Sequence, residues 1–217
     1  MIDLVSVNVG QPEIIGTRRG RPVMSSIRKH PVTTDTVFVG LTNIAGDAQA
    51  DLRVHGGAHK AVYAYSTDHL SYWTDLMKPD APYGPGALGE NLSVAGVDES
   101  GVCIGDVWQW GSAVLQVCQP RYPCYKLGLA TGKPAFVKRF LESGRSGWYL
   151  RVLQAGQATT TGPIVVRERD RAGISVREAA LAVSQNFEPE RQLEISAHPA
   201  LAPRWAEMLR HLAITPA

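Results

Sequence analysis

Short stretches in which hydrophobic and polar residues alternate dominate the first three quarters of the chain. Near the N-terminus, Val5, Val7 and Val9 alternate with Ser6 and Asn8, and this period of two is typical of a half-buried strand. Comparable apolar runs occupy residues 36–39, 106–110, 113–117, 147–153 and 164–166, and the last two are expected to form a strand pair. Many short strands with few long helices predict a closed or nearly closed β-barrel.

Turn and capping residues mark where individual elements begin and end. Gly111-Ser112 separates two strand-like runs and predicts a hairpin, because glycine suits the first position of a type II′ turn. Ser66 is expected to cap a helix that runs to Lys78. Pro134 and Gly144 bracket a second helix, with proline in its first turn and glycine after its end. Both helices are expected to pack on the barrel.

After about residue 171 the pattern changes to helical spacing. Ser175 and Glu178 stand three residues apart, as in a capping box, and apolar residues follow at helical intervals. Pro189 and Pro203 fit the starts of two further short helices. We therefore expect a mostly β (α+β) protein, with a barrel domain over residues 1–168 and a three-helix extension over 171–217. Helices this short are not stable alone, so the extension should dock on the barrel or on a partner.

Composition disfavours several classes of protein. The chain has 217 residues, a formal net charge of +2 and no long run of Lys or Arg, so charge gives no support to nucleic-acid binding. Its three cysteines, at positions 103, 118 and 124, include no CxxC pair, which argues against a disulfide framework and a zinc ribbon. No stretch is typical of a signal peptide or a membrane span, and a reducing cytoplasm is the expected setting.

Cys124 is the first candidate for chemistry. It ends the segment Gln119–Cys124, in which Pro120 and Pro123 restrict the backbone of the loop. Arg121 and Lys126 are close in sequence, and nearby cations lower the pKa of a thiol and favour the thiolate, which is both a nucleophile and a ligand for soft metals. A buried structural cysteine is the competing interpretation. Local sequence alone leaves the two about equal.

A second polar cluster contains Asp47, Asp51 and His55, followed by Gly56-Gly57 and His59. Carboxylates and imidazoles are common metal ligands, but two glycines between the histidines disfavour a zincin-type helix. The favoured interpretation is a loop whose glycines let the backbone approach a ligand, with Asp47 and Asp51 orienting His55 through hydrogen bonds. A buried turn whose polar groups merely satisfy one another is the alternative.

A third motif, Gly84–Gly89, matches the dinucleotide fingerprint GxGxxG only in its letters. A genuine fingerprint follows a strand and opens a helix, whereas this one runs into the strand-like segment 91–94. Glu90 and Asn91 at the start of that segment could read the edge of a heterocycle by hydrogen bonding, or could belong to an ordinary turn.

Taken in order, the Asp-rich segment with His55-Gly56-Gly57, the Glu90-Asn91-Leu92 strand, Gly105-Asp106 and the Gln119–Cys124 loop resemble MOSC-domain proteins. This family comprises the C-terminal domain of molybdenum cofactor sulfurases and its stand-alone relatives. The likeness runs from about residue 24 to 168, and the helical extension is similar to that of the bacterial YiiM-like branch. The resemblance implies a β-barrel that binds the molybdenum cofactor, a pterin dithiolene carrying molybdenum and a phosphate.

The resemblance also implies an activity, namely reduction of N-hydroxylated compounds such as hydroxylaminopurines and amidoximes. Molybdenum would accept the oxygen of the N–O bond, and a separate flavin or iron–sulfur reductase would supply the electrons. Cys124 would be the protein ligand to molybdenum, His55 and Asp47 would shape the site, and His55 could donate a proton. Candidate donors to the pterin and its phosphate are Arg121, Lys29, Lys126 and Arg145. The remaining residues assigned to the cofactor site are Asp51, Gly56, Gly57, Glu90 and Asn91.

Two rival functions use the same residues. In one, Cys124 holds cofactor or persulfide as a carrier or sulfur-transfer protein, without turnover of an external substrate. In the other, Cys124 is a plain nucleophile with His55 as its base. A homodimer is compatible with the sequence, which does not specify the oligomeric state. No membrane partner is expected.

Overall fold

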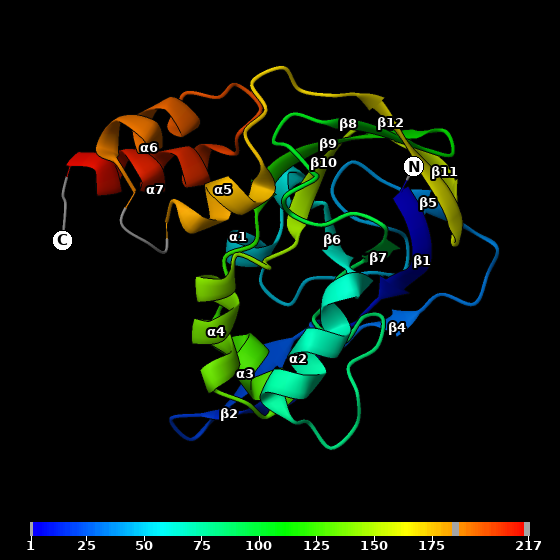
Figure 1. Ribbon diagram of the computed structural model, residues 1–217. Helices are drawn as coiled ribbons and strands as arrows, with labels where there is room; N and C mark the ends of the chain where they lie inside the picture. The colour runs from blue at the N-terminus through cyan, green and yellow to red at the C-terminus, as the bar shows by residue number, and fades with distance from the viewer. Residues whose placement is uncertain (1, 184–186, 215–217) are drawn as a thin grey trace.

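Seven strands of the described chain close into a barrel, in agreement with the fold class that the sequence predicts (Figure 1). The computed structural model describes residues 2–183 and 187–214. Neighbours around the barrel follow the order β12-β8-β9-β10-β6-β7-β1, and pairing of β1 with β12 closes the ring. The barrel strands are β1 (Ile2–Val9), β6 (Val62–Ser66), β7 (Leu92–Ala95), β8 (Val107–Trp110), β9 (Ala113–Pro120), β10 (Trp148–Gln154) and β12 (Gly162–Glu168).

Strand pairing in the barrel is antiparallel except between β6 and β7, which run parallel because a helical crossover connects them. The predicted hairpin across Gly111-Ser112 is confirmed, with β8 and β9 in register from Trp110↔Ala113. The expected pairing of residues 147–153 with 164–166 is wrong. Strand β10 pairs with β9 and β6, whereas β12 pairs with β8 and β1, because barrel closure separates the two.

Smaller sheets and helices surround the barrel. Two strand pairs stand outside it, β2 (Glu13–Arg18) with β3 (Arg21–Ser25) and β5 (Thr36–Val39) with β11 (Gly156–Thr159), while β4 (His30–Pro31) extends the edge of β1. The helices are α1 (Leu52–His55), α2 (Leu70–Met77), α3 (Tyr125–Thr131), α4 (Ala135–Ser143), α5 (Val176–Leu181), α6 (Pro189–Ser196) and α7 (Pro203–Ile214), with short 3₁₀ turns η1 (Ala58–Lys60) and η2 (Thr67–His69).

The cap predictions hold in most places. Ser175 accepts a hydrogen bond from the Glu178 amide at the start of α5, and Gly144 ends α4 in the left-handed conformation, with a φ of 67°. Ser66 precedes a 3₁₀ turn rather than α2 itself, and its side chain makes no capping bond. Each confirmed cap satisfies backbone groups that a helix end leaves unpaired.

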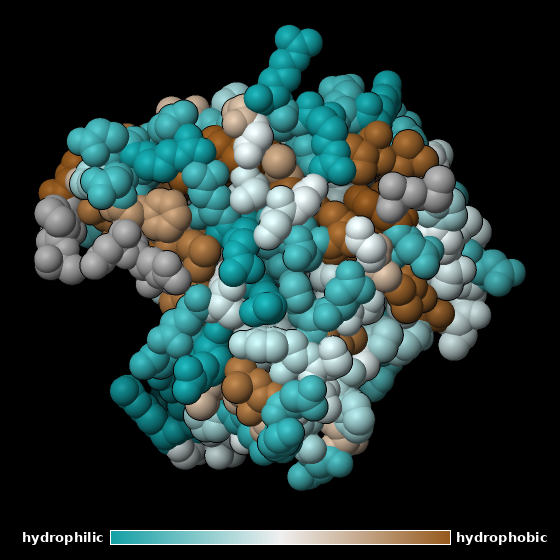
Figure 2. All heavy atoms as spheres, viewed as in Figure 1, coloured by the Kyte–Doolittle hydropathy of each residue, from teal (hydrophilic) through white to brown (hydrophobic). Residues whose placement is uncertain are grey.

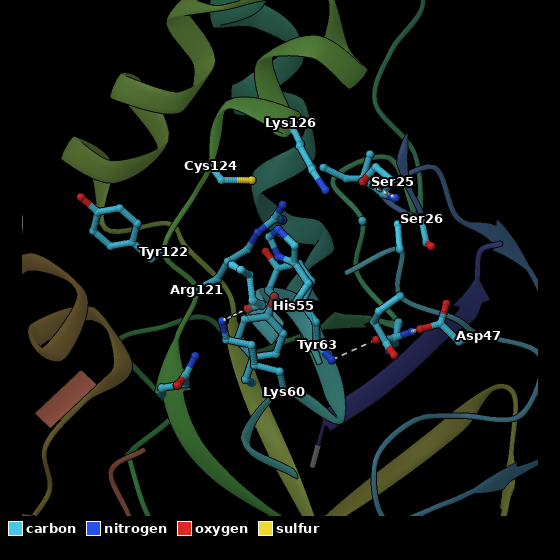
Figure 3. Close-up of a pocket in the computed structure, with 18 of the residues that line it drawn as sticks. Ser25, Ser26, Asp47, His55, Lys60, Tyr63, Arg121, Tyr122, Cys124 and Lys126 are labelled. Carbon is cyan, nitrogen blue, oxygen red and sulfur yellow. Dashed lines mark hydrogen bonds between the residues drawn. The ribbon is translucent and has the colours of Figure 1, made fainter. Parts of the chain in front are cut away.

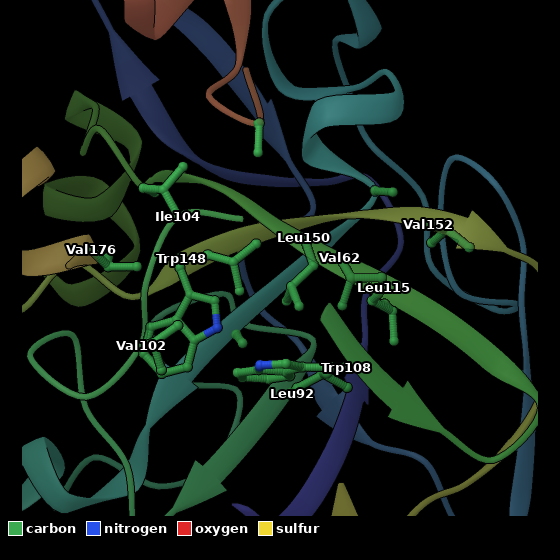
Figure 4. Packing of buried hydrophobic residues seen from close by; sticks show 14 of the residues in the cluster. Val62, Leu92, Val102, Ile104, Trp108, Leu115, Trp148, Leu150, Val152 and Val176 are labelled. Carbon is green, nitrogen blue, oxygen red and sulfur yellow. The ribbon is translucent and has the colours of Figure 1, made fainter. Parts of the chain in front are cut away.

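The main hydrophobic core fills the barrel and continues into the C-terminal helices. Figure 4 shows Trp108 and Trp148 packed against strand residues such as Leu115, with Val176 of α5 nearby. Side chains of α6 and α7, including Leu209, belong to the same cluster, so the extension is docked on the barrel. The division into domains 1–168 and 171–217 remains a prediction.

A second core lies between α2, α4 and the outside of the barrel, where Trp73, Phe136 and Phe140 are fully buried with Tyr65. In Figure 2, hydrophobic side chains also gather over the side formed by β5, β11 and β12, where Phe38 and Val165 are exposed. No helix within residues 2–183 and 187–214 is both long and apolar enough to cross a bilayer.

Candidate functional site

A cavity of about 330 Å³ opens where one end of the barrel meets the C-terminal helices. Its lining comes from segments far apart in the sequence, and Figure 3 shows how their side chains converge. The residues that line it are Ser25, Ser26, Ile27, Lys29, Asp47, Ala48, Gln49, Ala50, Val54, His55, Lys60, Tyr63, Gly89, Asn91, Gln119, Arg121, Tyr122, Cys124, Lys126, Tyr149, Arg204, Trp205 and Met208.

Cys124 lies where the sequence predicts a stiff loop, four residues beyond the end of β9 and immediately before α3. It is half-buried and unpaired, and in Figure 3 its sulfur points into the cavity between Arg121 and Lys126. The other cysteines are elsewhere: Cys118 is buried in β9 and Cys103 is half-buried beside α5. Cys124 is therefore the thiol that a cavity ligand can reach.

Arg121 forms part of the cavity floor. Its guanidinium is buried, lies 4.7 Å from the centroid of the Tyr63 ring and donates a hydrogen bond to the carbonyl of Leu88. Its backbone amide donates to the carbonyl of Gly147 at 3.3 Å. Stacking on Tyr63 and the hydrogen bond to Leu88 hold the planar cation in one orientation, and no carboxylate within residues 2–183 and 187–214 forms an ion pair with it.

Asp47 is the centre of a buried hydrogen-bond network. One carboxylate oxygen accepts from the Gly10 amide at 2.8 Å and from the Lys29 ammonium, and the other accepts from the Asn91 side chain at 3.0 Å. Asn91 in turn accepts from the Tyr63 amide at 3.1 Å. Burial lowers the pKa of Lys29, although Asp47 raises it. The network joins three separate segments beneath the cavity.

His55 ends the short helix α1, which Asp51 caps by accepting from the Arg53 amide at 3.1 Å. Neither Asp47 nor Asp51 orients the imidazole as predicted. The Asp47 carboxylate accepts from Gly10, Lys29 and Asn91 instead. The Asp51 carboxylate pairs with Arg53, and the hydrogen bond between Asp51 and His55 runs from the His55 amide to the Asp51 carbonyl, at 2.9 Å. Burial and, to a smaller extent, the charges of Lys126 and Lys60 lower the pKa of His55 to about 4. His55 is therefore neutral at pH 7.

The two glycines after His55 shape the backbone, but they do not line the cavity, although the sequence predicts that they let the backbone approach a ligand. Helix α1 ends at Gly56, where an added Cβ would meet Leu52 at 2.7 Å. Gly57 has a φ of 93°, a conformation that disfavours other residues. They end the helix and turn the chain toward η1, next to the cavity but not on its surface.

Glu90 and Arg145 lie away from the cavity surface. Glu90 is fully buried, and its oxygens accept from the amides of Gly86 and Leu88 at 2.7 and 3.1 Å and from the Ser93 hydroxyl. It therefore holds the preceding glycine loop in place instead of facing a ligand. Arg145 stacks on the ring of Tyr72, 4.2 Å from its centroid. Asn91 does line the cavity, but its amide is engaged with Asp47.

Several lining residues were not identified from the sequence. Ser25 is the last residue of β3 and Ser26 follows it, and the Ser26 hydroxyl is buried without a hydrogen-bond partner in the described chain. Lys60 comes from η1 and Arg204 from the first turn of α7. Nothing in their local sequence distinguishes them, because each becomes a site residue only through its position next to other segments.

The cavity carries a strong positive charge. Its cationic side chains are Lys29, Lys60, Arg121, Lys126 and Arg204, against the single carboxylate of Asp47. With His55 neutral, five cations and one anion leave a formal charge of +4 in a molecule whose net charge is +2. A partly enclosed site of this kind attracts anions. Within residues 2–183 and 187–214, no three His, Cys, Asp or Glu side chains form a metal-binding group.

Comparison with known proteins identifies the family and supports the fold. A model of the MOSC domain family matches residues 51–172. The protein YiiM of Escherichia coli is 31% identical over 94% of this chain and 90% of its own length. A crystal structure of YiiM from Geobacillus stearothermophilus superposes with a TM-score of 0.81 at 33% identity, covering 97% of this chain and 98% of that one. A protein of Gibberella moniliformis named reductase is 38% identical over 61% of this chain, but the match spans 24% of that longer protein.

Proposed function

The chain belongs to the MOSC domain family, and we propose that it is a molybdenum-cofactor-dependent oxidoreductase that reduces N-hydroxylated compounds such as hydroxylaminopurines and amidoximes. The observation that carries the proposal is the position of Cys124. Its free thiol faces a cavity of formal charge +4 that has room for a ligand. The reductase name of one relative also supports an oxidoreductase.

The residues present fit a phosphorylated pterin that carries a soft metal. Cys124 offers the kind of sulfur donor that soft and thiolate-bound metals prefer. On one side of the cavity, Ser26 has a buried hydroxyl without a partner, and Lys126 has no carboxylate partner in the described chain. In Figure 3, Lys126 extends toward Ser25 and Ser26, so a phosphate or pterin edge there would satisfy these donors.

The reaction converts R–NHOH, two protons and two electrons into R–NH₂ and water. When bound, the cofactor would supply the two-electron reduction at molybdenum. Cys124 would hold the metal, and Arg121 on Tyr63 would present a fixed planar cation to the pterin. Neutral His55 has a ring N–H that can donate a hydrogen bond to the departing oxygen without adding a further charge to the cationic cavity. The electrons would come from a separate flavin or iron–sulfur reductase, since three cysteines without a CxxC pair offer no cluster site.

The test compares molybdenum and pterin content in the wild type, Cys124→Ala and Cys103→Ala, all made in a cofactor-competent host. Cys103 is the matched control, because it is also a free, half-buried thiol but does not line the cavity. We expect near-stoichiometric molybdenum and reduction of an amidoxime by the wild type and Cys103→Ala, and loss of both in Cys124→Ala with unchanged urea unfolding. A metal-loaded, active Cys124→Ala variant would contradict the ligand assignment. Bound cofactor without reduction of any N-hydroxylated compound would favour the carrier function instead.

A further inference from the structure

Two cations from distant parts of the chain line the same cavity. Lys60 ends η1, and Arg204 lies in the first turn of α7. Both line the cavity that contains Cys124. Burial lowers the pKa of Lys60, the charge of Arg204 lowers it further and Cys124 raises it, so Lys60 lies within electrostatic reach of both residues. The C-terminal helix is therefore part of the site and not merely an appendage to the barrel.

Neither cation is neutralised by the protein. The Lys60 ammonium donates to the carbonyl of Val54 at 2.6 Å, and Arg204 makes no hydrogen bond or ion pair within residues 2–183 and 187–214. The two carboxylates of the segment before α1 already have partners. Asp47 pairs with the buried Lys29, and Asp51 pairs with the exposed Arg53. Two cations in one partly enclosed cavity repel each other, so a bound dianion would relieve this repulsion and gain charge-assisted hydrogen bonds.

This pair is separate from the cations assigned to the cofactor. In Figure 3, Lys126 lies beside Ser25 and Ser26, whereas Lys60 lies on the opposite side of His55. The cofactor carries a single phosphate, so a second phosphate would belong to another ligand.

The surface next to Arg204 suits an aromatic ring. Trp205 and Met208 of α7 line the cavity beside Tyr122, and the Tyr122 and Trp205 rings lie 6.3 Å apart in an edge-to-face arrangement. The indole N–H of Trp205 donates to the carbonyl of Ala179, which fixes the ring. Aromatic side chains beside cations are compatible with a nucleotide, whose base can pack against a ring while its phosphate binds the cations.

We propose that Lys60 and Arg204 bind the phosphate monoester of the substrate, and that the cavity therefore favours N-hydroxylated nucleotides over the corresponding nucleosides and free bases. This inference rests on the proposed function. It assigns α7 a role in substrate selection. The same phosphate chemistry could come from the cofactor, and the experiment separates the two sources.

The test uses three substrates that differ only in ribose and phosphate: 6-N-hydroxylaminopurine, its ribonucleoside and its ribonucleoside 5′-monophosphate. The holoenzyme is assayed with a chemical electron donor. We expect kcat/KM for the monophosphate to exceed that for the nucleoside about tenfold or more in the wild type, and Arg204→Gln to remove most of this ratio through KM, as for a lost charge-assisted hydrogen bond. Arg210→Gln is the matched control, since Arg210 lies on the same helix outside the cavity and should keep the ratio.

A binding measurement makes the result independent of turnover. Calorimetry compares adenosine 5′-monophosphate with adenosine on each protein as purified, and the monophosphate should bind more tightly to the wild type but not to Arg204→Gln. Equal affinities in the wild type would overturn the inference. So would an unchanged kcat/KM ratio in Arg204→Gln, and if that variant also lost molybdopterin, the phosphate bound there would be the cofactor's. Protein without molybdenum that reduces none of the three substrates would refute the proposed function, while the calorimetry would still decide the phosphate subsite.

Discussion

Replacing Asp47 by Asn should show how strongly the floor of the cavity depends on one buried charge. The carboxylate is 1% exposed and its partner Lys29 is 8% exposed, so both charges are shielded from water. Asn has the same shape and can still accept from the Gly10 amide. Its NH₂ group, however, would then face the Asn91 NH₂ group, which is also a donor.

The expected cost follows from the burial of the pair. Removing one partner of a buried ion pair leaves an uncompensated charge and destabilises a protein by about 3–5 kcal/mol. Domains of this kind have a total stability of roughly 5–15 kcal/mol, so the variant should lose a large share of it. Because burial already lowers the pKa of Lys29, the unpaired lysine should lose its proton more readily, and the destabilisation should shrink as pH rises toward the unperturbed value of 10.5.

Urea unfolding of four proteins provides the measurement: the wild type, Asp47→Asn, the double variant Asp47→Asn/Lys29→Met and Glu13→Gln. The double variant removes the orphaned charge, so its unfolding free energy should return to within about 2 kcal/mol of the wild type. Glu13→Gln breaks the exposed pair with Arg28, in which both side chains are 47% exposed, and should cost no more than about 1 kcal/mol.

An unfolding free energy of Asp47→Asn within about 1 kcal/mol of the wild type would contradict this expectation, because an unpaired buried ammonium should destabilise the protein by more than that. The expectation also fails if the double variant is less stable than Asp47→Asn. That result would mean that the hydrogen bonds to Gly10 and Asn91, rather than the charge pair, hold the three segments together.

Two further changes test the same region. Ring signals of His55 in an NMR titration should give a pKa of about 4, well below 6.5. The contribution of neutral His55 to stability is therefore complete above pH 6.5 and is lost as pH falls from 6.5 toward 4, and His55→Gln should flatten the pH dependence of unfolding in this range. A measured pKa near 6.5 would disprove the effect of burial. Gly147→Ala places a Cβ 2.5 Å from the Ala64 carbonyl and 2.7 Å from the Tyr63 ring, at a φ of 62°. In urea unfolding, the loss of unfolding free energy should be about 2 kcal/mol larger than that of Gly162→Ala. Gly162 shares a positive φ, but a Cβ there meets no atom within 4 Å. Equal losses in the two variants would mean that backbone strain alone determines both.

The sequence by itself determined the features that depend on neighbouring residues. Strand periodicity, the Gly111-Ser112 turn and the Ser175 cap are local, because each is set by side chains within a few positions of one another. The loop that presents Cys124 was predictable for the same reason, since Pro120 and Pro123 restrict it directly.

Only the tertiary structure decided which polar residues share one cavity. Closure of the barrel through β1 and β12 separates strands that looked like partners, and docking of α7 on the barrel places Arg204 in the same cavity as Lys60 and Cys124. The position of Glu90 beside Asn91 in the sequence indicated a ligand contact. In the folded protein, Glu90 is fully buried and accepts from the amides of Gly86 and Leu88 in its own loop. Register and helix docking depend on contacts between distant segments, and these leave no periodic signal in the residues that end up facing the ligand.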